Sequence, residues 1–430
     1  MILSVTVGAA TCLAMIIAVL FFPKIRIGRI SPSSYWVVTL AGAAALLIFG
    51  AVDPADVGAA LIANTAINPL KILVLFISMT LLSIFLDELG FFRYLASVTL
   101  RRAGSSQTRL FLVLYVTVSV LTVFTSNDII ILSFTPFICY FARSAHVSPL
   151  PYLAAEFVAA NTWSMALIIG NPTNIYLVTA AGGDFISYLC TMLLPTLASG
   201  AVAFVCLFLL FRRKLSDPIK AEPERVRIDD RLSLVVGIVH LAVCTLLLAV
   251  GSYIGLQMWL ISLVCALSLL SFALVLSLVR KRAPRAALSC LRRAPWELVP
   301  FILSMFVVVE ALHENGVTQL AFRALSTVHP VWGYGITSFL TANLINNIPM
   351  SVLYSAILSG GASEAAVYAT VVGSNLGACL TPIGALAGIM WSSILKEHSL
   401  KFGYTDFLRI GVTVALPALL AALGVLTLLF

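Results

Sequence analysis

Residues 121–136 of the chain read LTVFTSNDIIILSFTP, and residues 340–349 read LTANLINNIP. Each stretch places polar residues in the middle of a longer apolar segment, 110–142 in the first case and 331–359 in the second. The arms on either side of the polar tip are short for a membrane crossing, which needs about 20 residues. Lipid cannot satisfy free backbone groups at such a tip, so protein or a water-filled cavity must surround it. We therefore predict two re-entrant hairpins, each entering and leaving the membrane on one side.

The composition indicates that lipid is the solvent for much of this chain. Of its 430 residues, 61% are hydrophobic and 10% are charged, whereas a soluble domain carries about a quarter charged residues. Because residues 2–22 lack a basic start and Lys24 follows them, we predict a retained helix there rather than a signal peptide. Outside the hairpins, ten segments are apolar and long enough to cross a bilayer. They lie at 2–22, 35–52, 69–89, 150–180, 184–211, 232–254, 257–279, 296–315, 364–396 and 405–430.

The positively charged residues predict the orientation of these segments. With the N-terminus outside, the predicted cytoplasmic loops are 23–34, 90–109, 143–149, 212–231, 280–295 and 396–404. These loops and their edges hold all but three of the 26 Lys and Arg residues, namely Lys71, Arg323 and Arg409. This distribution follows the positive-inside rule. We therefore predict a multi-pass protein of the cell membrane, of the bacterial inner-membrane type, with both termini outside. Topology explains the basic charge, so no nucleic-acid partner is expected.

The cysteines show no pattern of a metal site or a disulfide framework. The eight Cys residues stand singly, without a Cys-x-x-Cys pair or His partners at ligand spacing, and such sites need clustered spacings. We predict packing roles for them, with no metal and no cofactor. No catalytic cluster stands at a predicted membrane interface either, so an enzyme is not expected.

The order of the predicted elements repeats. Five crossings and one hairpin precede the charged loop 212–231, and the same series follows it; an odd number of crossings turns the second series upside down. We therefore predict an all-α polytopic membrane protein of ten transmembrane helices and two re-entrant hairpins in two inverted-topology repeats. The first repeat is 1–211, the cytoplasmic linker is 212–231, and the second repeat is 232–430. Residues at matching spacing support the repeat: Ser78, Met79, Glu88 and Gly90 in the first half, and Ser304, Met305, Glu314 and Gly316 in the second.

The crossing that follows each hairpin carries a polar break, so two of the helices are expected to be discontinuous. The first break runs from Asn161 to GNPTN at 170–174, and the second from GSN at 373–375 to TPIG at 381–384. Free backbone groups cost several kcal/mol each in hydrocarbon. Helix N-termini at such breaks favour an anion or an oxygen-rich solute, and released carbonyls favour a cation. The pseudo-symmetry would bring the two tips and the two breaks together near the midplane as one binding site.

The polar residues of these four breaks are the predicted substrate-binding residues. The set is Asn127, Asn171, Thr173, Asn174, Asn346, Asn347, Ser374, Asn375, Thr381 and Gly384. For each single residue, the alternative is that it only caps a half-helix.

Asp128 is the predicted ion-coupling residue, because a carboxylate within a membrane is a candidate proton carrier or cation ligand. The sequence pairs it with the neutral Asn347 in the other half, and the alternative role is a helix cap. Glu156 is expected near the cytoplasmic end of its segment, where its side chain can reach the interface. Glu88 and Glu314 are expected to share a structural role at the ends of matching helices.

The motifs resemble the ion transporter superfamily, which includes the arsenite/antimonite permeases and the divalent-anion/sodium symporters. The resemblance rests on SNDIIILSFTP (126–136), AANTWSMALIIGNPTN (159–174), NNIP (346–349) and GSNLGACLTPIGALAGIMW (373–391), and the last is most similar to the arsenical pump membrane proteins. It implies a scaffold domain and a transport domain that moves against it like an elevator. It also raises, without deciding, a homodimer and a cytoplasmic ATPase that docks on the protein.

Two transport functions follow as expectations. One is proton-coupled efflux of arsenite- or antimonite-type metalloid hydroxides by a secondary active transporter, in which amides and hydroxyls bind the solute and Asp128 binds the proton. The other is sodium- or proton-coupled transport of carboxylates or inorganic anions through the same site. A passive channel is less consistent with paired breaks and a protonatable tip.

Overall fold

The structure is a computed structural model that describes residues 2–22, 24–25, 32–63, 68–216, 218–219, 226–400 and 402–430. These residues are almost entirely helical, and the only β-type pairings among them are two isolated bridges. The prediction of an all-α protein is thereby confirmed. Some positions of the predicted loops 23–34, 212–231 and 396–404 lie outside the described residues.

The helices of the first half are α1 (Ile2–Phe21), α2 (Ser34–Ile48), α3 (Pro54–Ile62), α4 (Pro69–Glu88), α5 (Phe91–Ala103), α6 (Gln107–Phe124), α7 (Asn127–Ser144), α8 (Leu150–Trp163), α9 (Pro172–Ala180) and α10 (Phe185–Phe211). Those of the second half are α11 (Arg231–Gly251), α12 (Met258–Val279), α13 (Arg285–Arg293), α14 (Leu298–Glu314), α15 (Val317–Leu325), α16 (Pro330–Ile345), α17 (Asn347–Leu358), α18 (Glu364–Gly377), α19 (Leu386–Glu397), α20 (Tyr404–Ile410) and α21 (Leu416–Leu429).

Seven helical segments of the described chain are long and apolar enough to cross a membrane. They are Pro69–Glu88, Gln107–Phe124, Phe185–Phe211, Arg231–Gly251, Met258–Val279, Arg285–Glu314 and Tyr404–Leu429. The first and second helices are apolar but shorter, and the two broken crossings are each divided between two helices. The first hairpin differs from its prediction, because α6 has 18 residues and begins at Gln107, before the predicted segment. At 1.5 Å per residue this arm is about 27 Å long, close to the thickness of the hydrocarbon core.

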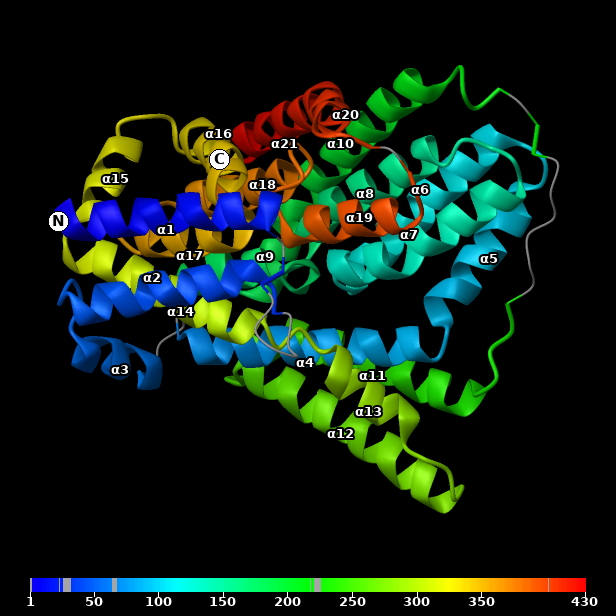
Figure 1. The fold of residues 1–430 in the computed structure, drawn as a ribbon, viewed down its shortest axis with the longest axis horizontal. Coiled ribbons are helices and arrows are strands. Elements are labelled where there is room, and N and C mark those ends of the chain that lie inside the picture. The colour runs from blue at the N-terminus through cyan, green and yellow to red at the C-terminus, as the bar shows by residue number, and fades with distance from the viewer. Residues whose placement is uncertain are drawn as a thin grey trace.

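The two halves have the same order of elements. Each contains two apolar helices, a short helix, a long crossing, a second short helix, a hairpin, a broken crossing and a final apolar stretch. In both halves the second short helix follows a glycine with positive φ, Gly90 (φ 76°) or Gly316 (φ 77°), a conformation that favours glycine. Figure 1 shows α4 and α14 running in opposite directions along the long axis of the molecule. The inverted repeat predicted from the sequence is present.

Two predicted loops contain helices that sequence patterning did not reveal. Helix α5 lies within 90–109 and α13 within 280–295. Both helices bury one face, with Phe92 and Ala96 of α5 and Cys290 of α13 buried, and both carry two arginines in the last turn. The charge density indicated loops, but the narrow apolar face of each helix packs on a neighbouring helix.

The helices pack in two layers. The first layer comprises α1, α2, α4, α11, α12 and α14, and the second comprises the two hairpins, the two broken crossings, α10 and α21. Within the second layer, α8 packs on α6, α7 and α10, while α18 packs on α16 and α21. Figure 1 shows α4, α11 and α12 along one side and α10, α18 and α21 along the other. The four predicted breaks therefore all lie in the second layer.

Candidate functional site

The breaks of the two discontinuous crossings meet at Asn375 of α18. Its Oδ1 accepts hydrogen bonds from Ser164 Oγ (2.8 Å) and Asn171 Nδ2 (3.0 Å), and its Nδ2 donates to Asn174 Oδ1 (2.6 Å). All four side chains are buried. Asn171 and Asn375 are 204 positions apart in the sequence, so this contact joins the two halves.

The tip of the first hairpin belongs to the same network. Asn127 Nδ2 donates to Asn161 Oδ1 at 3.0 Å, and Ser164 Oγ also contacts the Asn161 carbonyl at 2.8 Å. We call Asn127, Asn161, Ser164, Asn171, Asn174 and Asn375 the asparagine network. Sequence reasoning named four of its members; Asn161 appeared only as the start of a break, and Ser164 was missed.

The first break is held open by local chemistry. Two short 3₁₀ turns, Ser164–Ala166 and Ile168–Gly170, separate α8 from α9. A Cβ on Gly170 would lie 2.3 Å from the Ser164 carbonyl oxygen, so only glycine fits there. Asn174 Nδ2 donates to the carbonyls of Ser164 and Leu167, which the interrupted helix has left free. The α9 helix then begins with an Asn171 cap and Pro172, a common start signal.

The tip of the second hairpin is attached to the second break. Asn346 has φ 73°, and its Nδ2 donates to the Ile383 carbonyl at 2.8 Å. The backbone N–H of Asn347 donates to the Gly384 carbonyl at 2.9 Å. Asn343 completes this cluster, since its Oδ1 accepts from Thr381 Oγ1 at 2.7 Å. Asn343 was missed, because it precedes the polar tip by one helical turn. Asn346, Asn347, Thr381 and Gly384, all predicted, therefore lie in a second cluster beside the asparagine network.

Among the described residues, the buried atoms without a hydrogen-bond partner include Ser126 Oγ, Thr173 Oγ1, Asn347 Oδ1 and Ser374 Oγ. Three of them belong to predicted site residues, and Ser126 precedes Asn127. An unpaired buried polar atom costs about 1–3 kcal/mol and needs an explanation, such as a ligand or ordered water. These atoms are hydroxyls and an amide oxygen, and within the part of the chain that the structure describes no Lys or Arg side chain takes part in the hydrogen bonds of either cluster. The arrangement suits a neutral solute with several hydroxyl groups.

Asp128 lies in the first turn of α7, where the helix N-terminus favours a negative charge. Among the described residues, its carboxylate forms no hydrogen bond or ion pair, although its backbone amide donates to Asn127 Oδ1. The predicted pairing with Asn347 shifts by one residue. Helices α7 and α17 begin at Asn127 and Asn347, so Asp128 corresponds to Ile348. The helix starts give this register, whereas the motif spacing of the sequence pairs Asp128 with Asn347.

Glu156 does not reach the membrane interface as predicted. It is 0% exposed, and Thr135 Oγ1 lies 2.9 and 3.1 Å from its two oxygens. The α8 helix starts at Leu150, so Glu156 lies nearly two turns inside and faces α7. The glutamates Glu88 and Glu314 also differ: Glu88 pairs with Arg293 of α13, whereas Glu314 forms no ion pair within the described part of the chain.

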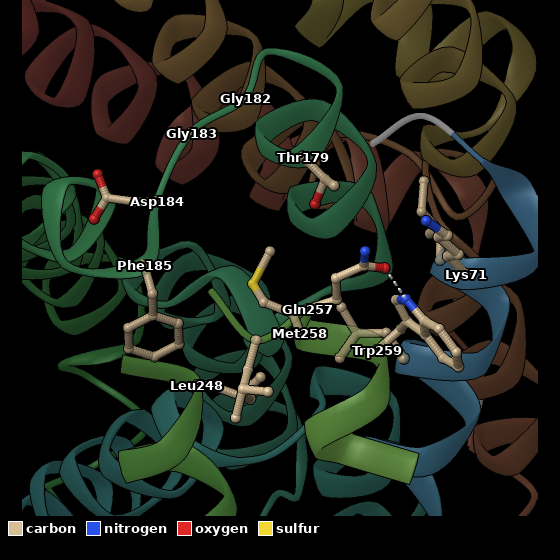
Figure 2. A pocket seen from close by; sticks show the side chains of 13 residues that line it. Lys71, Thr179, Gly182, Gly183, Asp184, Phe185, Leu248, Gln257, Met258 and Trp259 are labelled. Atoms are coloured by element: carbon tan, nitrogen blue, oxygen red, sulfur yellow. Dashed lines mark hydrogen bonds between the residues drawn. The ribbon is translucent and has the colours of Figure 1, made fainter. Parts of the chain in front are cut away.

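A cavity of about 340 Å³ lies away from both clusters, between α4, the α9–α10 turn and the α11–α12 turn. Figure 2 shows Lys71 and Trp259 on one side of it and Asp184 and Phe185 on the other. None of the predicted site residues lines this cavity, and its walls are largely apolar. It is therefore not the site that the breaks form.

Comparisons with known proteins agree with this architecture. Residues 25–372 match the family model described as CitMHS, citrate transporter. An arsenical pump membrane protein of Escherichia coli (strain K12) is 30% identical over 417 residues, covering 91% of this chain and 93% of that protein. A putative arsenical pump membrane protein of Bacillus subtilis (strain 168) is 26% identical, covering 86% and 88%. The fold is similar to the YdaH transporter of Alcanivorax borkumensis, with a TM-score of 0.56, 15% identity and coverage of 99% and 97%.

Proposed function

We propose that this chain, which belongs to the CitMHS citrate transporter family and thus to the ion transporter superfamily, exports a neutral metalloid hydroxide such as arsenite or antimonite in exchange for protons. That it is a multi-pass membrane transporter follows from the family, from its relatives and from its apolar helices. The substrate, the coupling ion and the direction of transport are the proposal.

The polar groups of the asparagine network and of the second cluster support this proposal. Amide and hydroxyl groups both donate and accept hydrogen bonds, which matches a solute whose hydroxyl groups do the same. A di- or trianion is bound most strongly by Arg or Lys, and neither contributes to the clusters. The unpartnered atoms of Thr173, Asn347 and Ser374 would then bind the solute. The names of the arsenical pump relatives point to the same solute class.

Coupling is assigned to Asp128. Its carboxylate lies beside the asparagine network without a fixed partner, so it is free to take up and release a proton as its surroundings change. We propose that the second layer, which contains the network, moves against the first layer like an elevator. The protein would lie in the cell membrane with both termini outside.

The alternative is sodium- or proton-coupled transport of carboxylates or inorganic anions. The name of the matching family, citrate transporter, favours it, and the partial positive charges at the starts of α7, α9, α17 and α19 could bind a weakly charged anion. Neither the homodimer nor the docking ATPase is needed for either function.

Flux in proteoliposomes separates the two proposals. Purified protein is reconstituted, proton and sodium gradients are imposed separately, and arsenite, antimonite, citrate and succinate are compared. The first proposal requires arsenite flux that rises with an opposing proton gradient. Arsenite flux that is unaffected by the proton gradient would contradict the first proposal, and succinate flux driven by sodium would contradict it and support the alternative.

A further inference from the structure

A second cavity of about 210 Å³ lies between the two layers. Helices α3 and α14 form one side and α9 and α17 form the other. Its polar lining comprises Tyr176, Glu310, His313, Ser355 and Ser359. It therefore lies where any movement of one layer against the other would change its shape.

The cavity leads to the candidate site along two helices. Helix α9 begins next to Thr173 and α17 begins at Asn347, and the two helices pack against each other. Tyr176, which lines the cavity, follows Thr173 by three residues, or about 4.5 Å along the helix. Within the described residues, the hydroxyl of Tyr176 is buried and unpartnered, like Thr173 Oγ1 and Asn347 Oδ1. Unpaired polar atoms thus stand both at the cavity and at the clusters.

Because of the inverted repeat, the helices around this cavity have equivalents at the other end of the molecule. Counted from the matching residues Ser78 and Ser304, Asp87 of α4 corresponds to His313 of α14. Counted from the helix starts Asn127 and Asn347, Ser133 of α7 corresponds to Leu353 of α17. Helix α13 likewise takes the place of α3. If both ends were alike, a cavity would lie between α4, α7 and α13.

Side-chain contacts bridge the helices at that counterpart position. Ser133 Oγ donates to Asp87 Oδ1 at 2.6 Å, which joins α7 of the second layer to α4 of the first. Arg293 of α13 donates to Asp87 Oδ2 at 2.6 Å and also pairs with Glu88. We call Asp87, Glu88, Ser133 and Arg293 the closing cluster. The corresponding residues near the open cavity form no such cross-layer bond in the described part of the chain: His313 contacts Thr318 of α15, and the apolar Leu353 does not line the cavity.

From this asymmetry we infer that the cavity between α3, α9, α14 and α17 is the vestibule through which a small neutral polyhydroxylated solute reaches the site, and that the closing cluster seals the equivalent route at the opposite end. The solute class rests on the proposed function; the route does not. Transport would then require the closing cluster to break and the vestibule to close, as alternating access demands.

Cysteine accessibility tests the route on the full-length protein in sealed vesicles of both orientations. Ala356 lines the vestibule and is half-buried, so Ala356→Cys places a thiol there. The native Cys139 of α7 is buried and occupies the position that corresponds to Ser359. Both thiols are labelled with a charged, membrane-impermeant methanethiosulfonate, and labelling is followed peptide by peptide by mass spectrometry. The exposed Cys190 is replaced by serine.

We expect the Ala356→Cys thiol to react at least tenfold faster than Cys139, from the side of the chain termini, and its modification to reduce flux at least tenfold. Ser133→Ala, and separately Asp87→Asn, should raise the labelling rate of Cys139 from the opposite side and lower that of the Ala356→Cys thiol. Ser133→Ala serves as the milder variant in case Asp87→Asn impairs folding.

The outcomes separate the two proposals. If the Ala356→Cys thiol is unreactive, or its modification leaves flux unchanged, the vestibule is wrong even where arsenite is transported. If Ser133→Ala leaves both labelling rates unchanged, the closing cluster is wrong. If labelling behaves as expected but the transported solute is a carboxylate, the proposed function fails and the route stands.

Discussion

Replacing Asn375 by alanine should destabilise the transporter more than any single hydroxyl deletion in the first layer. Asn375 Nδ2 donates to Asn174 Oδ1, and its Oδ1 accepts from Asn171 Nδ2. Neither of those two atoms has another hydrogen-bond partner among the described residues, whereas Ser164 Oγ keeps its bond to the Asn161 carbonyl. At about 1–3 kcal/mol for each unsatisfied buried group, the loss is about 2–6 kcal/mol.

The measurement is the thermal midpoint in detergent, followed by the size-exclusion profile after heating. Thr245→Ala is the control, because it removes one side-chain hydrogen bond to the Leu241 carbonyl in α11, remote from the breaks. We expect Asn375→Ala to lower the midpoint by several times the shift of the control and to abolish flux, because the break that positions Thr173 would lose its anchor. Equal midpoints for the two variants, with flux retained in Asn375→Ala, would refute the idea that Asn375 holds the two halves together.

Three further variants test single residues. Asp128→Asn should abolish the effect of a proton gradient on flux in proteoliposomes, whereas Asp184→Asn, at the cap of α10, should not; wild-type pH dependence in Asp128→Asn would reduce Asp128 to a helix cap. Gly170→Ala should lower the thermal midpoint, since the added methyl would lie 2.3 Å from a carbonyl oxygen and overpacking costs about 1–3 kcal/mol; Gly58→Ala, in helix α3 with open space around it, should not lower the midpoint, because alanine favours a helix over glycine. Glu156→Gln should keep the wild-type midpoint, because glutamine retains an oxygen for the neighbouring hydroxyl and an isolated buried carboxylate would be very costly; a large loss of stability would show that Glu156 is ionised and paired in the fold.

Some of the site could be predicted from sequence because its residues violate the local pattern. Asn127, Asn171 and Asn346 stand in apolar segments where a polar residue has no local reason to be, and a membrane makes such a residue costly unless it is bound. Ser164 and Asn343 gave no such signal. A single Ser or Asn within a helix commonly bonds to the preceding turn, as Asn343 also does through Nδ2. Its further contacts, to the Gly377 carbonyl and from Thr381 Oγ1, place it in the cluster.

The amino-acid sequence by itself determined the all-helical class, the inverted repeat and the positions of the four breaks. These follow from local properties, namely segment length, apolar content and the need to satisfy a broken backbone in lipid. Only the tertiary structure decided that Asn375 is the meeting point of two breaks, that Glu156 is buried against Thr135, and that Ser133 bonds to Asp87 at one end while a cavity lies at the other. Those contacts join residues far apart in the chain, and the pseudo-symmetry that predicts equal ends cannot show which of them is open.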